Sequence, residues 1–168
     1  MLQAVAAIIL SAAAHAPQPP DLAAQTEKMK AFSMLEGNWS GDGWVLTDDG
    51  KTRLHQKEEV RLMLGGAILT LHGAGEIGDR QTDATASFEA FAIISFDEAN
   101  DAYAMRSYAF GHAGDFPITP RANGFTWSAP GVRYDATVED GEWTEKGWRQ
   151  LADGGEIQFI EFTVCREE

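Results

Sequence analysis

The sequence is poor in cysteine and in basic residues. Cys165 is the single cysteine among 168 residues, which excludes an intramolecular disulfide and leaves packing to hold the fold. The 13 Lys and Arg residues stand against 26 Asp and Glu residues, so the formal net charge is −13. Nucleic acids and anionic membrane surfaces attract proteins through Lys and Arg. The charge balance therefore argues against both as partners.

Long apolar runs are also absent, apart from one short run near the N-terminus. Residues 4–16, AVAAIILSAAAHA, are uncharged and end in Ala14-His15-Ala16, which is typical of a secretory signal peptide, although no Lys or Arg precedes the run. The run is too short to span a bilayer, which takes ~20 residues. We therefore expect a signal peptide over residues 1–16, a Pro-rich spacer over 17–22, one domain over 23–168, and export to the periplasm or the medium.

A helix is predicted to follow the spacer. Asp21 is a suitable N-cap, and Gly37 can adopt the left-handed conformation that ends a helix at about Glu36. The apolar residues between them recur at helical spacing and would form one stripe: Leu22, Met29, Phe32 and Leu35.

After Trp39 the apolar period changes from helical spacing to two. About ten extended segments follow, near 39–47, 54–64, 67–76, 87–96, 101–110, 113–119, 123–128, 131–139, 142–151 and 156–166. Gly, Asn and Asp in the short gaps favour tight hairpins, and such gaps permit only antiparallel neighbours. Closure into a barrel would remove both edges of this sheet. We predict an all-β fold, an up-and-down antiparallel β-barrel of about ten strands with one N-terminal helix.

Three short motifs carry a resemblance to a known group of barrels. They are LEGNW at 35–39, LMLGGAILTLHG at 62–73 and ISFDEANDAYAM at 94–105. With them the chain resembles the lipocalin and calycin group, and most closely the bacterial lipocalin-like domains of unknown function. The resemblance implies that Trp39 closes one end of the barrel and that Arg166, from the last strand, packs over it as a structural pair.

Several predicted strands carry apolar residues on both faces, which a sheet with one buried face does not need. A barrel of this size can enclose one small ligand, so the second apolar face indicates either a pocket or a tightly filled interior. Five polar or aromatic side chains could converge on the polar end of a ligand: His72, Arg106, Tyr108, Trp127 and Tyr134. A buried Arg106 would suit a carboxylate, whereas an ion pair of Arg106 with Glu161 or Glu59 is the structural alternative.

Signals for catalysis and for metal binding are weak. His55 and Glu59 lie four residues apart, about 13 Å along a strand, which is too far for a general-base pair. His112 and Asp115 could touch within one loop, and His55, His72 and His112 have no short metal-ligand spacing. Related haem barrels use a histidine near the C-terminus, and this chain has none after His112. We predict no catalytic residue, no metal and no cofactor.

The function predicted from the sequence is the binding of a small, mostly apolar ligand inside an exported lipocalin-like barrel. One alternative is an enzyme of the isomerase or hydrolase type that uses polar residues in the same cavity. Another is an interaction module with a filled core, which would pair through an exposed sheet face, for instance as a homodimer.

Overall fold

The computed structural model describes residues 22–79 and 84–168, and within these ranges ten antiparallel strands form a closed barrel. The predicted fold class is confirmed. The strands are β1 (Gly37–Thr47), β2 (Gly50–Met63), β3 (Ile68–Asp79), β4 (Ala84–Asp97), β5 (Ala102–Ala109), β6 (His112–Arg121), β7 (Gly124–Ala129), β8 (Val132–Glu139), β9 (Glu142–Gln150) and β10 (Glu156–Arg166). A short 3₁₀ segment, η2 (Leu64–Gly66), connects β2 to β3.

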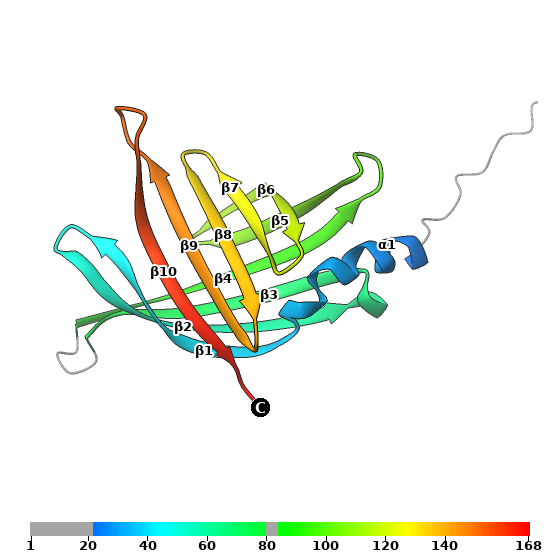
Figure 1. Cartoon of the computed structure of the whole chain (residues 1–168), viewed down its shortest axis with the longest axis horizontal. Helices are drawn as coiled ribbons and strands as arrows, with labels where there is room; N and C mark the ends of the chain where they lie inside the picture. Colours follow the sequence, from blue (N-terminus) through cyan, green and yellow to red (C-terminus); the bar gives the residue numbers. More distant parts are fainter. Residues whose placement is uncertain (1–21, 80–83) are drawn as a thin grey trace, which may run out of the picture.

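Each strand pairs with the next one in the chain, and β1 pairs with β10 to close the barrel (Figure 1). In the closing pair Trp39 lies opposite Arg166 and Val45 lies opposite Ile160. Cys165 of β10 is a free, exposed thiol. The up-and-down order follows from the short polar connections, which leave no room for a crossover.

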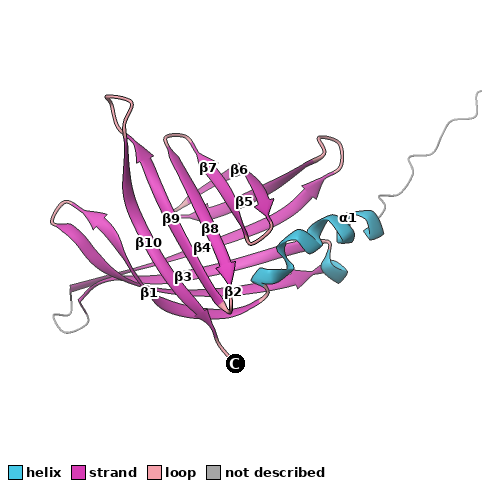
Figure 2. Ribbon diagram, viewed as in Figure 1, coloured by secondary structure: helices cyan, strands magenta, loops and turns pink. Residues whose placement is uncertain are grey.

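The helical segment lies across one end of the barrel (Figure 2). It begins as an α-helix, α1 (Leu22–Met29), and continues as a 3₁₀-helix, η1 (Lys30–Leu35), so the helical stretch predicted to end near Glu36 is present and consists of two kinds of helix. A 3₁₀-helix has three residues per turn, which places Phe32 and Leu35 on the same edge. Both are fully buried, as is Met29, whereas Leu22 is 54% exposed and does not belong to the stripe.

The predicted N-cap Asp21, the signal peptide at 1–16 and spacer residues 17–21 lie outside the described residues. No helix within the described ranges is long and apolar enough to cross a membrane.

The Gly37-Asn38-Trp39 junction connects η1 to the barrel. Trp39 is 1% exposed, and its indole Nε1 donates a hydrogen bond of 2.8 Å to the carbonyl oxygen of Leu35. Gly37 has φ +141°, and a Cβ atom there would lie 2.6 Å from Nη1 of Arg166. Glycine at position 37 therefore permits both the turn and the approach of the arginine.

Gly43 of β1 allows close contact with β10. A Cβ atom at this position would lie 2.1 Å from the carbonyl oxygen of Glu161 and 2.5 Å from Cα of Phe162. Because both neighbours are backbone or attached to it, no side chain could be accommodated without moving the strand. The glycines of the GNWSGDGW stretch therefore allow the close packing of β1 against β10, the strand pair that closes the barrel.

Candidate functional site

The barrel interior contains a cavity of about 350 Å³. Most of its wall is apolar, with contributions from strands on all sides of the barrel; representative lining residues are Leu54, Leu71, Ile94, Phe125, Phe159 and Phe162. A β-bulge between Gln158 and Ile160 interrupts the alternation of β10, and Phe159 and Ile160 both line the cavity as a result. This interior cavity is the candidate functional site.

Four polar side chains without aromatic rings interrupt the apolar wall: Gln56 and Glu58 of β2, Ser107 of β5 and Glu145 of β9. Gln56 is 4% exposed and Glu145 is 7% exposed. Nε2 of Gln56 donates a hydrogen bond of 2.7 Å to Oε1 of Glu58. Nε1 of Trp127 donates one of 3.1 Å to Oε1 of Glu145. We refer to Glu58 and Glu145 below as the carboxyl pair.

The cavity shifts the titration of the carboxyl pair toward neutral pH. Burial raises the pKa of Glu58 to about 8, against the hydrogen bond from Gln56, and the negative charge of Glu145 raises it further. Burial raises the pKa of Glu145 to about 7, opposed by the indole groups of Trp127 and Trp143 and assisted by the charge of Asp135. Both shifts follow from the loss of hydration that an ionised carboxylate would have in water. Near pH 7 the pair therefore holds at least one proton.

Gly73 of β3 makes room for the carboxyl group of Glu58. The two residues are opposite each other in the antiparallel register. A Cβ atom at position 73 would lie 3.0 Å from each carboxyl oxygen of Glu58 and 3.3 Å from Nε2 of Gln56. The absence of a side chain at 73 therefore lets the carboxyl group lie against the backbone of β3.

Trp143 supplies a buried hydrogen-bond donor to the same cavity. The residue is 1% exposed, and its ring packs edge-on against Trp39 and Phe125, with centroid distances of 5.9 and 5.8 Å. Its Nε1 has no hydrogen-bond partner among the described residues. The indole nevertheless lies close enough to Glu145 to lower the pKa of that carboxyl. A buried, unpaired N–H is unfavourable, and such groups are rare in folded proteins.

Two of the five predicted ligand-binding residues, Trp127 and Tyr134, line this cavity. Their rings are stacked, with centroids 3.9 Å apart and planes inclined by 3°. Burial also raises the pKa of the Tyr134 hydroxyl. The stack thus presents an aromatic surface next to Glu145, which accepts the Trp127 hydrogen bond.

The other three predicted residues, His72, Arg106 and Tyr108, do not line the cavity. Arg106 donates hydrogen bonds of 2.9 and 2.7 Å to the two carboxyl oxygens of Asp115 and one of 3.0 Å to the Tyr108 hydroxyl. The side chain of Arg106 is 50% exposed. The Nε2 atom of His72 lies 3.7 Å from Glu89, and its side chain is 45% exposed.

The predicted ion pair of Arg106 with Glu161 or Glu59 is wrong in its choice of acid. Glu161 pairs with Lys146 at 3.4 Å and Glu59 pairs with Arg61 at 3.2 Å, so neither holds Arg106. Asp115, which the sequence suggested as a partner of His112, is the acid that binds Arg106.

Glu58 and Glu145 are not among the site residues predicted from the sequence, although the sequence contains a pattern that indicates their inward position. In β2 the buried Leu54 and Val60 have the same parity as Gln56 and Glu58, while the residues between them are all polar. In β9 the buried Trp143 has the same parity as Glu145. An acid that alternates in register with buried apolar residues predicts an interior carboxyl group.

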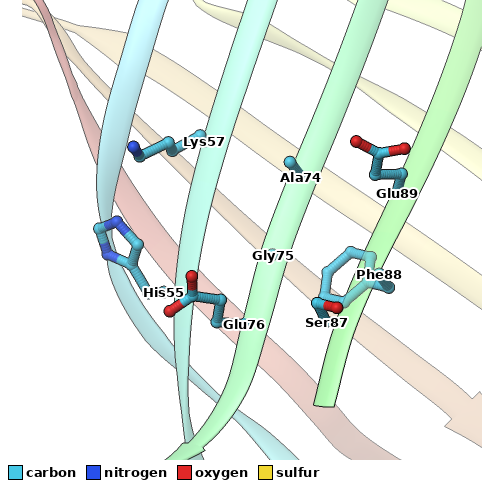
Figure 3. A pocket seen from close by; sticks show the side chains of 8 residues that line it. All are labelled: His55, Lys57, Ala74, Gly75, Glu76, Ser87, Phe88 and Glu89. Atoms are coloured by element: carbon cyan, nitrogen blue, oxygen red, sulfur yellow. The ribbon is translucent and has the colours of Figure 1, made fainter. Parts of the chain in front are cut away.

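A second depression lies on the outer face of β2, β3 and β4 (Figure 3). Its wall includes His55 and Glu76, which face each other across β2 and β3, and Ser87 of β4. Nδ1 of His55 lies 3.1 Å from Oδ1 of Asp42. Although its volume is about 520 Å³, the depression is open and bordered by exposed side chains such as Lys57 and Glu89. It lacks the largely apolar wall of the interior cavity.

The histidines do not form a metal centre in the described part of the chain. No cluster of three or more His, Cys, Asp or Glu side chains there could hold a metal ion. No histidine or cysteine is found among the described residues that line the interior cavity.

No family model and no curated protein matches the sequence. Among solved structures, 14 chains match. One is the crystal structure of Rv2717c from M. tuberculosis, with a TM-score of 0.61 and 8% sequence identity over 83% of this chain and 97% of that one. The likeness is one of fold. It supports a β-barrel of this architecture and leaves the function to be argued from the cavity.

Proposed function

We propose that the barrel binds a small, mostly apolar molecule in its interior cavity. The observation that supports this most directly is the interior space of about 350 Å³ with an apolar wall and a few polar groups. Pockets that bind small molecules have volumes of roughly 300–1,000 Å³ and combine apolar walls with a few well-placed polar groups. The cavity also argues against the filled-core alternative, in which side chains would occupy this space.

Two parts of the sequence-based interpretation accompany this proposal. Membership of the lipocalin-like or calycin group rests on the motifs at 35–39, 62–73 and 94–105, together with a barrel architecture that those motifs fit. Export rests on the apolar run at 4–16. N-terminal sequencing of the protein from its own host tests export, and a mature chain that still begins at Met1 would contradict it.

The binding proposal is tested with an uncharged fluorescent probe, N-phenyl-1-naphthylamine. We expect saturable enhancement of its emission by the wild-type protein. The variant Ala90→Trp fills part of the cavity and should abolish the enhancement, because Ala90 lines the cavity wall. The matched control Ala113→Trp adds the same side chain at an exposed position of β6 and should bind as the wild type does. Equal enhancement by both variants would place the probe elsewhere and contradict the proposal.

The carboxyl pair favours a second candidate function, acid–base catalysis in the same cavity. Carboxyl groups with pKa values of about 7 and 8 can both donate and accept protons near neutral pH. Native mass spectrometry of the protein from its host would identify a retained molecule. Incubation of that molecule with fresh protein separates the functions: an unchanged molecule indicates a binder, whereas conversion that Glu145→Gln abolishes indicates an enzyme.

A further inference from the structure

The acidic side chains in the cavity wall have no basic partner among the described residues that line it. Among the described residues that line it, Glu58 and Glu145 are the carboxylic acids, and none is Lys, Arg or His. A buried carboxylate is stable only when a positive charge or several hydrogen bonds compensate the loss of hydration. The described protein wall supplies some hydrogen bonds and no positive charge.

The hydrogen-bond donors around the carboxyl pair favour its ionised form. Gln56 donates to Glu58, Trp127 donates to Glu145, and the Trp143 indole lowers the pKa of Glu145 without completing a hydrogen bond. Donors directed at a carboxyl group stabilise the carboxylate over the acid. The described lining residues thus provide the negative partner of an ion pair and no positive charge to complete it.

The neighbouring aromatic rings suit a positive charge. The Trp127–Tyr134 stack and Trp143 line the same cavity as the carboxyl pair. Aromatic faces attract cations, and the attraction increases when the cation is removed from water. The net charge of −13 also favours the approach of cations over anions.

We propose that the carboxyl pair binds a basic nitrogen, so that the ligand of the barrel is a small apolar amine held as its cation between the two acids and the aromatic wall. This inference rests on the proposed function and narrows it to one ligand class. It disfavours ligands with a carboxylate, because such a group would enter a cavity with two acids and no positive side chain among its described lining residues.

Binding would proceed with a defined proton balance. An aliphatic amine is already protonated at pH 7 and enters as the ammonium ion. Where both carboxyl groups are protonated, one of them releases its proton to the solvent, and the resulting carboxylate pairs with the ammonium group. No other bond forms or breaks.

Three probes of one shape test the proposal by isothermal titration calorimetry at pH 7: 4-phenylbutylamine, 4-phenylbutanol and 4-phenylbutanoate. A charge-assisted hydrogen bond in a buried site should make the amine bind at least about tenfold more tightly than the alcohol, with the carboxylate weakest. In buffers of different ionisation enthalpy, amine binding should be accompanied by proton release and alcohol binding by none. The double variant Glu58→Gln/Glu145→Gln should bind the alcohol as before and lose the preference for the amine.

The control is Glu59→Gln, which removes the neighbouring exposed acid of β2 and should keep the preference. Equal binding of the amine and the alcohol by the wild type would overturn the inference and leave the proposed function intact. A preference for the amine that persists in the double variant would also overturn it. If none of the three probes binds and N-phenyl-1-naphthylamine does not bind either, the proposed function fails together with the inference.

Discussion

The guanidinium carbon of Arg166 lies 4.2 Å from the ring centre of Trp39, although the two residues are separated by most of the chain. The same guanidinium group donates hydrogen bonds to the carbonyl oxygens of Met34 and Glu36, at the end of η1. One arginine thus connects the last strand, the first strand and the helical segment at one end of the barrel. Cation–π contacts of this kind contribute ~0.5–2 kcal/mol.

Replacement of Trp39 by alanine should lower the free energy of unfolding by about 3–5 kcal/mol, as is typical for large buried aromatic residues. The change removes a fully packed ring, its hydrogen bond to Leu35 and the surface on which Arg166 lies. Urea denaturation measures the effect. Trp44→Ala is the control on the same strand; its ring is half-buried, so a smaller loss is expected. A free energy of unfolding equal to that of the wild type would show that Trp39 does not close the barrel.

Replacement of Gly43 by alanine should destabilise the seam between β1 and β10. The new Cβ atom would overlap the backbone of Glu161 and Phe162, and such overpacking typically lowers stability by about 1–3 kcal/mol. Gly50→Ala is an instructive comparison, because a Cβ atom there meets no atom within 4 Å and only its φ of +107° opposes the change. Thermal unfolding of both variants separates steric overlap from backbone strain. A Gly43→Ala protein as stable as the wild type would show that the strands can separate without loss.

The carboxyl pair should make the barrel less stable as the pH rises above the ordinary glutamate range. Folding raises the pKa of Glu58 from 4.5 to about 8 and that of Glu145 from 4.5 to about 7, so the folded state binds more protons than the unfolded state in this window. Their stabilising contribution is complete below pH 4.5 and disappears as the pH rises through about 7 to 8. One pKa unit corresponds to about 1.4 kcal/mol, so the total change is several kcal/mol.

Urea denaturation between pH 5 and pH 9 measures this dependence, and Glu58→Gln/Glu145→Gln should flatten it. Tyr134, in the same cavity, and Asp135, whose charge acts on Glu145, stay in place in that variant. The acids with lowered pKa values, among them Asp42 and Glu156, act with the opposite sign and at lower pH. An equally steep decline in the variant would assign the effect to other groups.

Replacement of Arg106 by leucine should leave ligand binding unchanged. The guanidinium group pairs with Asp115 and Tyr108, and its side chain is half exposed. An exposed ion pair contributes little to stability, so only a small change in melting temperature is expected. Titration with N-phenyl-1-naphthylamine checks the first point. Loss of binding without loss of fold would restore Arg106 as an anchor for the ligand and contradict the assignment of the site to the interior.

The strands could be predicted closely from the sequence, because turn residues and a period of two mark their ends. The segment expected at 142–151 is β9 at Glu142–Gln150, and the one expected at 156–166 is β10. Which face turns inward was harder to predict. The polar chemistry of Arg106 and His72 does not show which face of the sheet they occupy, whereas the parity that Glu58 shares with Leu54 and Val60 predicts that Glu58 points inward. The bulge of β10 changes parity within one strand and has no signal in the sequence.

The pairing of β1 with β10 has a consequence for the order of folding events. Every other strand pair joins strands that are neighbours in the chain, so its hydrogen bonds can form progressively from the connection between them. The β1–β10 pair must instead bring together residues as distant as Trp39 and Arg166. The entropic penalty for closing so large a loop grows with its length and must be met before the contacts of the seam stabilise it. An open sheet in which the nine pairs of sequential strands have formed and β1 and β10 are still free edges should therefore precede the native state. The rate of refolding should be sensitive to substitutions along the β1–β10 pair.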